Sequence, residues 1–148
     1  MQSILYSLLL IFSLTSEATR QKHFNTEKNL AIQGYDPVSY FTQSKAVKGK
    51  KEFAVKADGI LYYCSSKEHQ NLLLKNYTAY EPQYGGWCAY AMGAKGEKVS
   101  VNPETFKISG GKLYLFYNAY FNNTLKEWNK DEAGLSKKAD SNWTKIFK

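Results

Sequence analysis

Cysteine is scarce in this chain of 148 residues: Cys64 and Cys88 are the only two. A chain of this length can bury a sufficient core without disulfides or metal, so the fold does not require cross-links. Two options remain open for the pair. One is a single disulfide between them, and the other is two thiols that contribute to one metal site.

Arginine is scarcer still, because Arg20 is the only one, although the formal net charge is +7. Proteins that read phosphates and bases specifically favour arginine for its fork of donors. The lysines are scattered along the chain rather than gathered in one run. The sequence therefore predicts a solvated basic surface and argues against a nucleic acid partner.

Long apolar runs are missing except at the start of the chain. The run from Ile4 to Leu14 is too short to span a bilayer comfortably, and it is typical of the central region of a secretory signal peptide. Residues 1–18 are therefore predicted to be a signal peptide cut near Ala18, and the mature protein to be periplasmic or secreted. It would carry 20 basic and 12 acidic residues. Because no Lys or Arg precedes the run, a buried N-terminal helix and an uncleaved anchor are the alternatives. No later segment is apolar enough to cross a membrane, so no membrane partner is expected after cleavage.

A strand–turn–strand pattern and a helix follow a polar arm, residues 19–29, which we expect to be frayed. Alternation over residues 52–56, the Asp58-Gly59 pair and the run Ile60–Cys64 predict a β-hairpin. Ser65 and Glu68 match a capping box, which predicts a helix from there to about Asn76.

The second half of the chain is also predicted to contain a hairpin and helices. Gly110-Gly111 predicts the turn of a second hairpin, and two amphipathic stripes, beginning near Phe121 and Leu135, predict closing helices. The expected fold class is α+β: one domain over residues 30–148, in which small antiparallel β-hairpins pack with about three to four helices.

A Gly-Gly pair surrounded by aromatic residues is the most informative motif. Gly85-Gly86 is followed by Trp87 and Cys88, and tyrosines stand on both sides. Glycines let the backbone turn sharply or approach another group closely, and aromatic rings can wall a pocket. A thiol in this setting is either an inert core group or a soft ligand or nucleophile.

Several motifs, in order over residues 31–143, resemble secreted YHS domain-containing proteins of the stand-alone type. They include Ala31-Ile32-Gln33-Gly34-Tyr35-Asp36-Pro37-Val38-Ser39-Tyr40-Phe41, Pro82-Gln83-Tyr84-Gly85-Gly86-Trp87-Cys88-Ala89-Tyr90-Ala91 and Lys138-Ala139-Asp140-Ser141-Asn142-Trp143. The resemblance implies metal handling, because the wider group is taken to bind metal. Its cysteine-rich members carry two cysteines four residues apart, at positions that fall here on Ser65 and His69. The paired thiols are therefore not reproduced.

The candidate metal ligands are Cys88, His69 and Cys64. Thiolate and imidazole suit copper or zinc. Each residue also has a structural interpretation: Cys88 as a buried thiol, His69 as a histidine bonded at the core edge, and Cys64 as a small apolar residue or one half of a disulfide.

Four further residues, Tyr35, Asp36, Tyr84 and Trp87, are candidates to line a cofactor or ligand pocket. For Asp36 a hydrogen-bonded turn before Pro37 is the favoured alternative, and for the tyrosines a place in the core is the alternative.

The sequence predicts an exported small binding protein whose ligand is a transition metal, copper or zinc, held by a Cys/His site. The first alternative is a non-metal module that binds a small organic ligand or a partner protein in an aromatic pocket. The second is a thiol redox protein that uses Cys64 and Cys88. No enzyme signature is present, so an enzyme is the less favoured interpretation.

Overall fold

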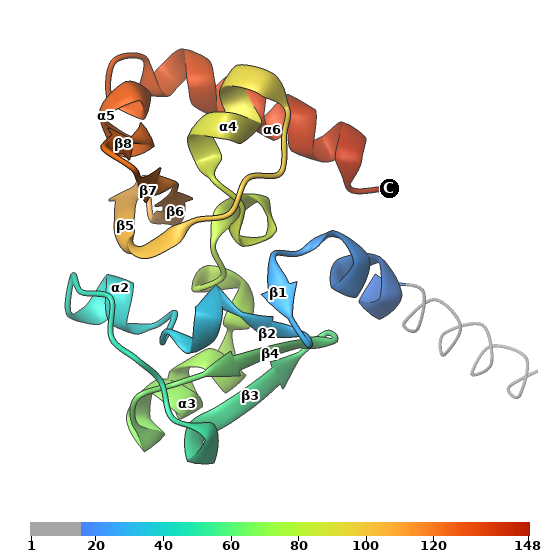
Figure 1. Cartoon of the computed structure of the whole chain (residues 1–148). Coiled ribbons are helices and arrows are strands. Elements are labelled where there is room, and N and C mark those ends of the chain that lie inside the picture. The colour runs from blue at the N-terminus through green and yellow to red at the C-terminus, as the bar shows by residue number, and fades with distance from the viewer. Residues whose placement is uncertain (1–15) are drawn as a thin grey trace, which may run out of the picture.

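The computed structural model describes residues 16–148, and Figure 1 shows two groups of elements at opposite ends of the molecule. One end holds a sheet in the order β1-β2-β4-β3 with helix α3 (Lys67–Lys75) packed against it. Its strands are β1 (Thr26–Glu27), β2 (Leu30–Ala31), β3 (Ala54–Ala57) and β4 (Ile60–Tyr63). The β2–β4 pair is parallel and the other two pairs are antiparallel.

The β3–β4 hairpin is confirmed, and local chemistry explains it. Asp58 and Gly59 both have positive φ, 43° and 83°, as a tight two-residue loop requires. The register pairs Ala57 with Ile60, which places the expected turn between them. The helix cap differs by one residue, because Ser66 rather than Ser65 accepts the hydrogen bond from the His69 amide, at 3.1 Å.

The other end of the molecule holds α4 (Ala89–Lys95), α5 (Thr124–Trp128) and α6 (Glu132–Ile146) over a hairpin of β5 (Asn102–Ser109) and β6 (Lys112–Phe116). A small second hairpin, β7 (Asn118–Ala119) with β8 (Asn122–Asn123), precedes α5. Helices α4 and α6 approach closely at Gly93, where an added Cβ would lie 2.6 Å from the Leu135 carbonyl oxygen.

A short helix and several 3-10 turns complete the fold. They are α2 (Ser39–Thr42) and the 3-10 turns η1 (Ile32–Gly34), η2 (Lys51–Phe53), η3 (Tyr77–Ala79) and η4 (Gln83–Gly86). The α+β class is as expected. The expected three to four helices are fewer than the described residues contain, because residues 16–23 form a helix within the expected arm and α2 spans only four residues. The helix expected to begin near Phe121 is present as α5, but it begins at Thr124.

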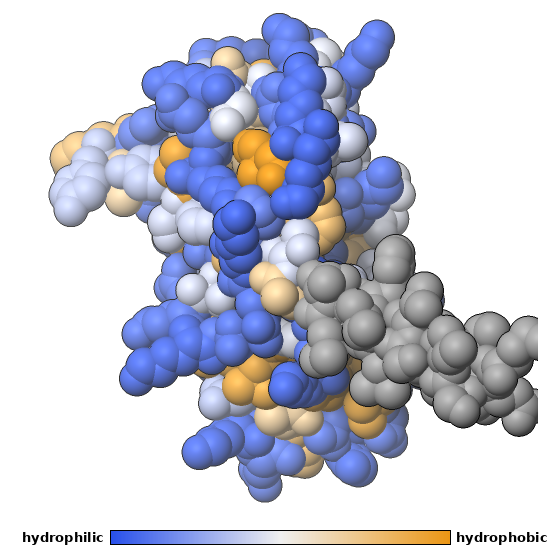
Figure 2. Space-filling model, turned by 90° about the vertical axis from the view of Figure 1, so that its right-hand side faces the viewer, coloured by the Kyte–Doolittle hydropathy of each residue, from blue (hydrophilic) through white to orange (hydrophobic). Residues whose placement is uncertain are grey.

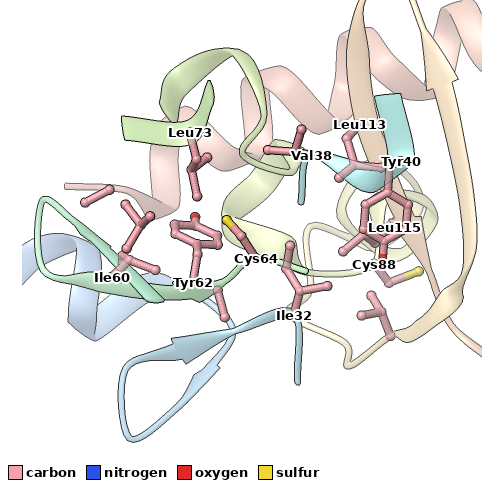
Figure 3. Packing of buried hydrophobic residues seen from close by; sticks show 14 of the residues in the cluster. Ile32, Val38, Tyr40, Ile60, Tyr62, Cys64, Leu73, Cys88, Leu113 and Leu115 are labelled. Atoms are coloured by element: carbon pink, nitrogen blue, oxygen red, sulfur yellow. The ribbon is translucent and has the colours of Figure 1, made fainter. Parts of the chain in front are cut away.

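Two apolar clusters form the core. The larger one contains both cysteines and joins the sheet end to β6 (Figure 3). The second lies between α4, α6 and β6, around the fully buried Trp128. The face drawn in Figure 2 is mostly hydrophilic, with small separate hydrophobic patches. None of the helices within residues 16–148 is long and apolar enough to cross a membrane.

The expectation of a frayed arm over residues 19–29 is wrong. Residues 16–23 are helical, and β1 follows them in the sheet. The Arg20 guanidinium binds both oxygens of Glu81, at 3.3 and 2.7 Å. His23 is buried, and its carbonyl accepts a hydrogen bond from the Trp87 indole at 2.7 Å. The predicted signal run Ile4–Leu14 lies outside the described residues.

Candidate functional site

Asp36 is fully buried and holds two segments of the chain together. Its Oδ1 accepts the Val38 amide at 2.8 Å, which is the hydrogen-bonded turn expected before Pro37. Its Oδ2 accepts three further bonds, from the Ser65 amide and hydroxyl, at 2.8 and 2.6 Å, and from His69 Nδ1 at 2.6 Å. A buried carboxylate with this many donors is a structural centre, because little of its capacity is left for a ligand.

His69 points into the same network from the first turn of α3. Its Nδ1 faces Asp36, and its Nε2 lies 3.2 Å from the Thr42 hydroxyl. Both ring nitrogens therefore have hydrogen-bond partners, and the side chain is only 6% exposed. A metal ion would have to displace one of these bonds.

Cys64 lies next to this network and is buried in the larger apolar cluster. Burial, together with the nearby Asp36 charge, raises the pKa of the Cys64 thiol to about 12. The thiolate is the form that binds metals and attacks disulfides. At neutral pH Cys64 is therefore a protonated core thiol.

Cys88 is equally buried but makes hydrogen bonds. Its Sγ accepts the Tyr117 amide at 3.3 Å and lies 3.4 Å from the Thr124 hydroxyl. Because Thr124 donates its only hydroxyl proton to the Tyr117 carbonyl, at 2.8 Å, the Cys88 thiol is the donor toward Thr124. Cys88 also borders a cavity of about 240 Å³ that includes Tyr90 and Tyr117.

The three predicted metal ligands take part in separate interactions. Both cysteines are free, and Figure 3 shows Cys64 beside Tyr62 and Cys88 beside Leu115. Residues 16–148 contain no group of three or more His, Cys, Asp and Glu side chains placed to hold a metal ion. The Cys/His metal site stays a prediction that these contacts do not strengthen.

The four predicted pocket residues are also dispersed. Asp36 belongs to the network above, and Tyr35 lies under the Lys48 ammonium, 4.2 Å from the ring centre. Trp87 donates to His23. Tyr84 lines a cavity.

That cavity, called the aromatic pocket below, has a volume of about 290 Å³ and lies where α6 meets η4. Three rings, those of Phe24, Tyr84 and Trp143, contribute to its lining. The remaining lining residues are Thr78, Glu81, Pro82, Gln83, Gly85, Asp140 and Thr144.

Gly85 makes the pocket possible. Its φ is +60°, and an added Cβ would lie 2.9 Å from both the Phe24 and the Trp143 rings. Only glycine allows the backbone to adopt this conformation without strain and to lie this close to two rings. The Gly-Gly motif thus serves the close approach that its sequence indicated, but the approach is to Phe24 and Trp143 rather than to a group beside Cys88.

The polar groups of the pocket are arranged in two pairs. Glu81 accepts bonds from Arg20 and from the Tyr62 hydroxyl. Asp140 accepts the Tyr84 hydroxyl at 2.9 Å. Burial, followed by the hydrogen bond to Asp140, raises the pKa of Tyr84 above its usual value, so the phenol remains the donor.

Sequence reasoning missed Phe24, Asp140 and Trp143 as pocket residues. Phe24 falls in the expected arm, and Asp140 and Trp143 enter the sequence analysis only as part of a resemblance motif and of a helix. The spacing of η4 and α6 along the chain gives no signal that they meet.

Comparisons with known proteins add no family to this description. No protein-family model matches the chain, and neither a curated protein nor a solved structure matches it. The likeness to YHS domain-containing proteins therefore rests on the motifs alone and remains a prediction.

Proposed function

We propose that this protein is a binding protein that takes a small organic ligand into the aromatic pocket. The observation that carries the proposal is the lining: three rings and several polar side chains around about 290 Å³, with more polar than apolar surface exposed in the cavity. Ligand sites fix the orientation of their ligand through a small number of placed polar groups, and the polar share of this lining favours a ligand that carries a polar or charged group. This volume is near the lower end of the usual range of ligand sites, which favours a small ligand.

The metal interpretation has less support than the organic ligand. Both ring nitrogens of His69 are engaged, the Cys64 thiol has a raised pKa, and the Cys88 thiol donates to Thr124. A thiol redox function that pairs the cysteines has no support from these contacts either.

Mapping by NMR tests the proposal. A mixture of small organic fragments, covering amines, sugars and aromatic acids, is added to isotope-labelled protein. We expect the largest shifts at the Gly85 amide and the Trp143 indole. Trp143→Leu should remove the response, whereas Tyr90→Leu, a matched change in the cavity beside Cys88, should preserve it.

Two results would overturn the proposal. One is the absence of any shift near Gly85 and Trp143 at millimolar fragment concentrations. The other is stoichiometric binding of zinc or copper that Cys88→Ser abolishes, which would restore the metal interpretation.

We also propose that the protein is exported, on the basis of the apolar run from Ile4 to Leu14 and the small residues that follow it. Cleavage near Ala18 would leave Arg20 and Phe24 in the mature chain. N-terminal sequencing of the protein from its native source should begin at about Thr19, and a chain that begins at Met1 would contradict cleavage.

A further inference from the structure

The aromatic pocket carries charge of the opposite sign from the chain as a whole. The formal net charge is +7, yet the two charged residues in the lining are the acids Glu81 and Asp140. Among the described residues, no Lys or Arg is part of this lining.

The two carboxylates are not equivalent. Glu81 is neutralised by the bidentate bond from Arg20, and its side chain is 11% exposed. Asp140 accepts the neutral Tyr84 hydroxyl through Oδ1, and its Oδ2 has no hydrogen-bond or ion-pair partner within residues 16–148. The uncompensated negative charge at this site is therefore that of Asp140.

Aromatic rings line the pocket next to this charge and can contact a cation. The Arg20 guanidinium carbon already lies 4.5 Å from the centre of the Phe24 ring, so one face of Phe24 holds a cation within the protein itself. Phe24 and Trp143 have ring centres 6.2 Å apart at a tilt of 54°, so they do not stack on each other. One face of Trp143 stacks on Phe147, with ring centres 5.4 Å apart and a tilt of 23°, which leaves its other face for a ligand. Aromatic faces attract ammonium groups, most strongly in the case of tryptophan.

We infer that the aromatic pocket takes an organic ammonium ion, a ligand with a methylated ammonium group that lies against Trp143 and is balanced by Asp140. This inference rests on the proposed function and names its ligand class. A methylated ammonium has few or no N–H donors, so it loses little hydration when it lies against an aromatic ring of the pocket. An anion would instead meet the Asp140 charge at close range.

The test compares choline with its uncharged isostere, 3,3-dimethylbutan-1-ol. The two differ in one atom and in charge, so a difference in affinity reports the charge alone. We expect choline to shift the Trp143 indole signal, and the isostere to bind roughly 5- to 30-fold more weakly, as expected for a cation–π contact with a counter-ion.

Variants assign the charge to its source. Asp140→Asn preserves the shape of an exposed side chain and should weaken choline binding severalfold without changing the affinity for the isostere. Glu52→Gln removes the same charge from an exposed site on η2 and should leave both affinities unchanged. Trp143→Phe retains a ring and should reduce choline affinity less than Trp143→Leu.

The outcomes separate this inference from the proposed function. Equal binding of choline and its isostere, or binding of neutral sugars in preference to both, would overturn the ammonium assignment while preserving an organic-ligand site. An unchanged choline affinity in Asp140→Asn would also overturn the assignment. If no fragment of any class binds at Gly85 and Trp143, both the inference and the proposed function fail.

Discussion

Cys64 and Cys88 have the same exposed fraction, 0%, but their sulfur atoms have different surroundings. Within the described part of the chain, Cys64 Sγ has no hydrogen-bond partner, and the nearest polar network belongs to Asp36. Cys88 Sγ accepts the Tyr117 amide and lies within hydrogen-bond range of Thr124. Cys64 therefore fills apolar space. Cys88 instead connects Tyr117, the residue after β6, to Thr124, the first residue of α5.

The comparison shows that burial alone does not assign a role to a cysteine. A sulfur without partners behaves as a small hydrophobic group. A sulfur that both accepts and donates fixes the positions of its neighbours, and its removal leaves a buried amide without an acceptor. Cys64 is a protonated core thiol, and the Cys88 sulfur is held by its bonds to Tyr117 and Thr124, which is why the aromatic pocket rather than either cysteine is the basis of the proposed function.

The largest expected effect concerns the network beside Cys64. Asp36→Ala removes the acceptor for four hydrogen bonds and leaves His69 without its carboxylate partner. We expect the free energy of unfolding to fall by about 3–5 kcal/mol, because several buried donors lose their acceptor at once. Urea unfolding followed by circular dichroism would measure it, with Glu52→Ala as an exposed acidic control. A loss below about 1 kcal/mol would show that the network is not a centre of stability.

Serine and alanine variants at both positions test the comparison directly, because the more stable variant should be serine at position 88 and alanine at position 64. At position 88, Ser can replace both interactions of the thiol, whereas Ala leaves the Tyr117 amide unpaired, so Cys88→Ala should be the less stable by about 1–3 kcal/mol. At position 64, Ser buries a hydroxyl in an apolar site, so Cys64→Ser should be less stable than Cys64→Ala by about 1–3 kcal/mol. Chemical unfolding of the four variants measures both differences. The same order at both positions would remove the distinction between the two sites.

The sequence predicted features that depend on neighbouring residues and failed on those that depend on distant ones. The β3–β4 hairpin follows from Asp58-Gly59, and the turn at Asp36 follows from the proline after it. The order of the arm depends instead on Arg20 bonding Glu81, 61 residues away. The pattern of residues 19–29 gives no indication that Arg20 contacts a residue so far away in the sequence.

The candidate site shows the same limit. The Gly85-Gly86 pair predicts either a sharp turn or a close approach of the backbone to another group, and the structure shows the close approach at Gly85. The groups it approaches, Phe24 and Trp143, stand in segments that were interpreted by their own local patterns. Asp36 and His69 are both candidates from the sequence, and the structure brings them into contact as hydrogen-bond partners, a pairing that the sequence does not predict.

The pH dependence of stability should distinguish Cys64 from the other ionisable groups. The unfolded thiol ionises near pH 9, whereas the folded one remains protonated to about pH 12. Between these values the unfolded state binds fewer protons, so the free energy of unfolding falls as pH rises, by at most about 1.4 kcal/mol per pH unit. Unfolding measured from pH 8 to 10.5 should show a smaller fall in Cys64→Ala than in the parent. Parallel profiles would place the Cys64 pKa near its ordinary value.

The smallest expected effect concerns the β7–β8 hairpin, which lies between the two residues that bond Cys88. Its two-residue loop, Tyr120-Phe121, has φ values of 50° and 63°, and the side chains are 92% and 112% exposed. Asn-Gly is the usual loop for this backbone, since bulky side chains strain a left-handed conformation. Tyr120→Asn with Phe121→Gly should therefore raise the free energy of unfolding by about 1 kcal/mol.

A thermal melt of that double variant would measure the gain, and Leu74→Gln, at another exposed apolar residue, should change stability by no more than about 0.5 kcal/mol. Both side chains of the loop are exposed, so the packing of residues 16–148 does not compensate for the strained backbone. If the Asn-Gly loop instead lowers stability, the tyrosine and phenylalanine must support the hairpin. The order of Tyr117 and Thr124 around Cys88 would then depend on the loop as well as on the thiol.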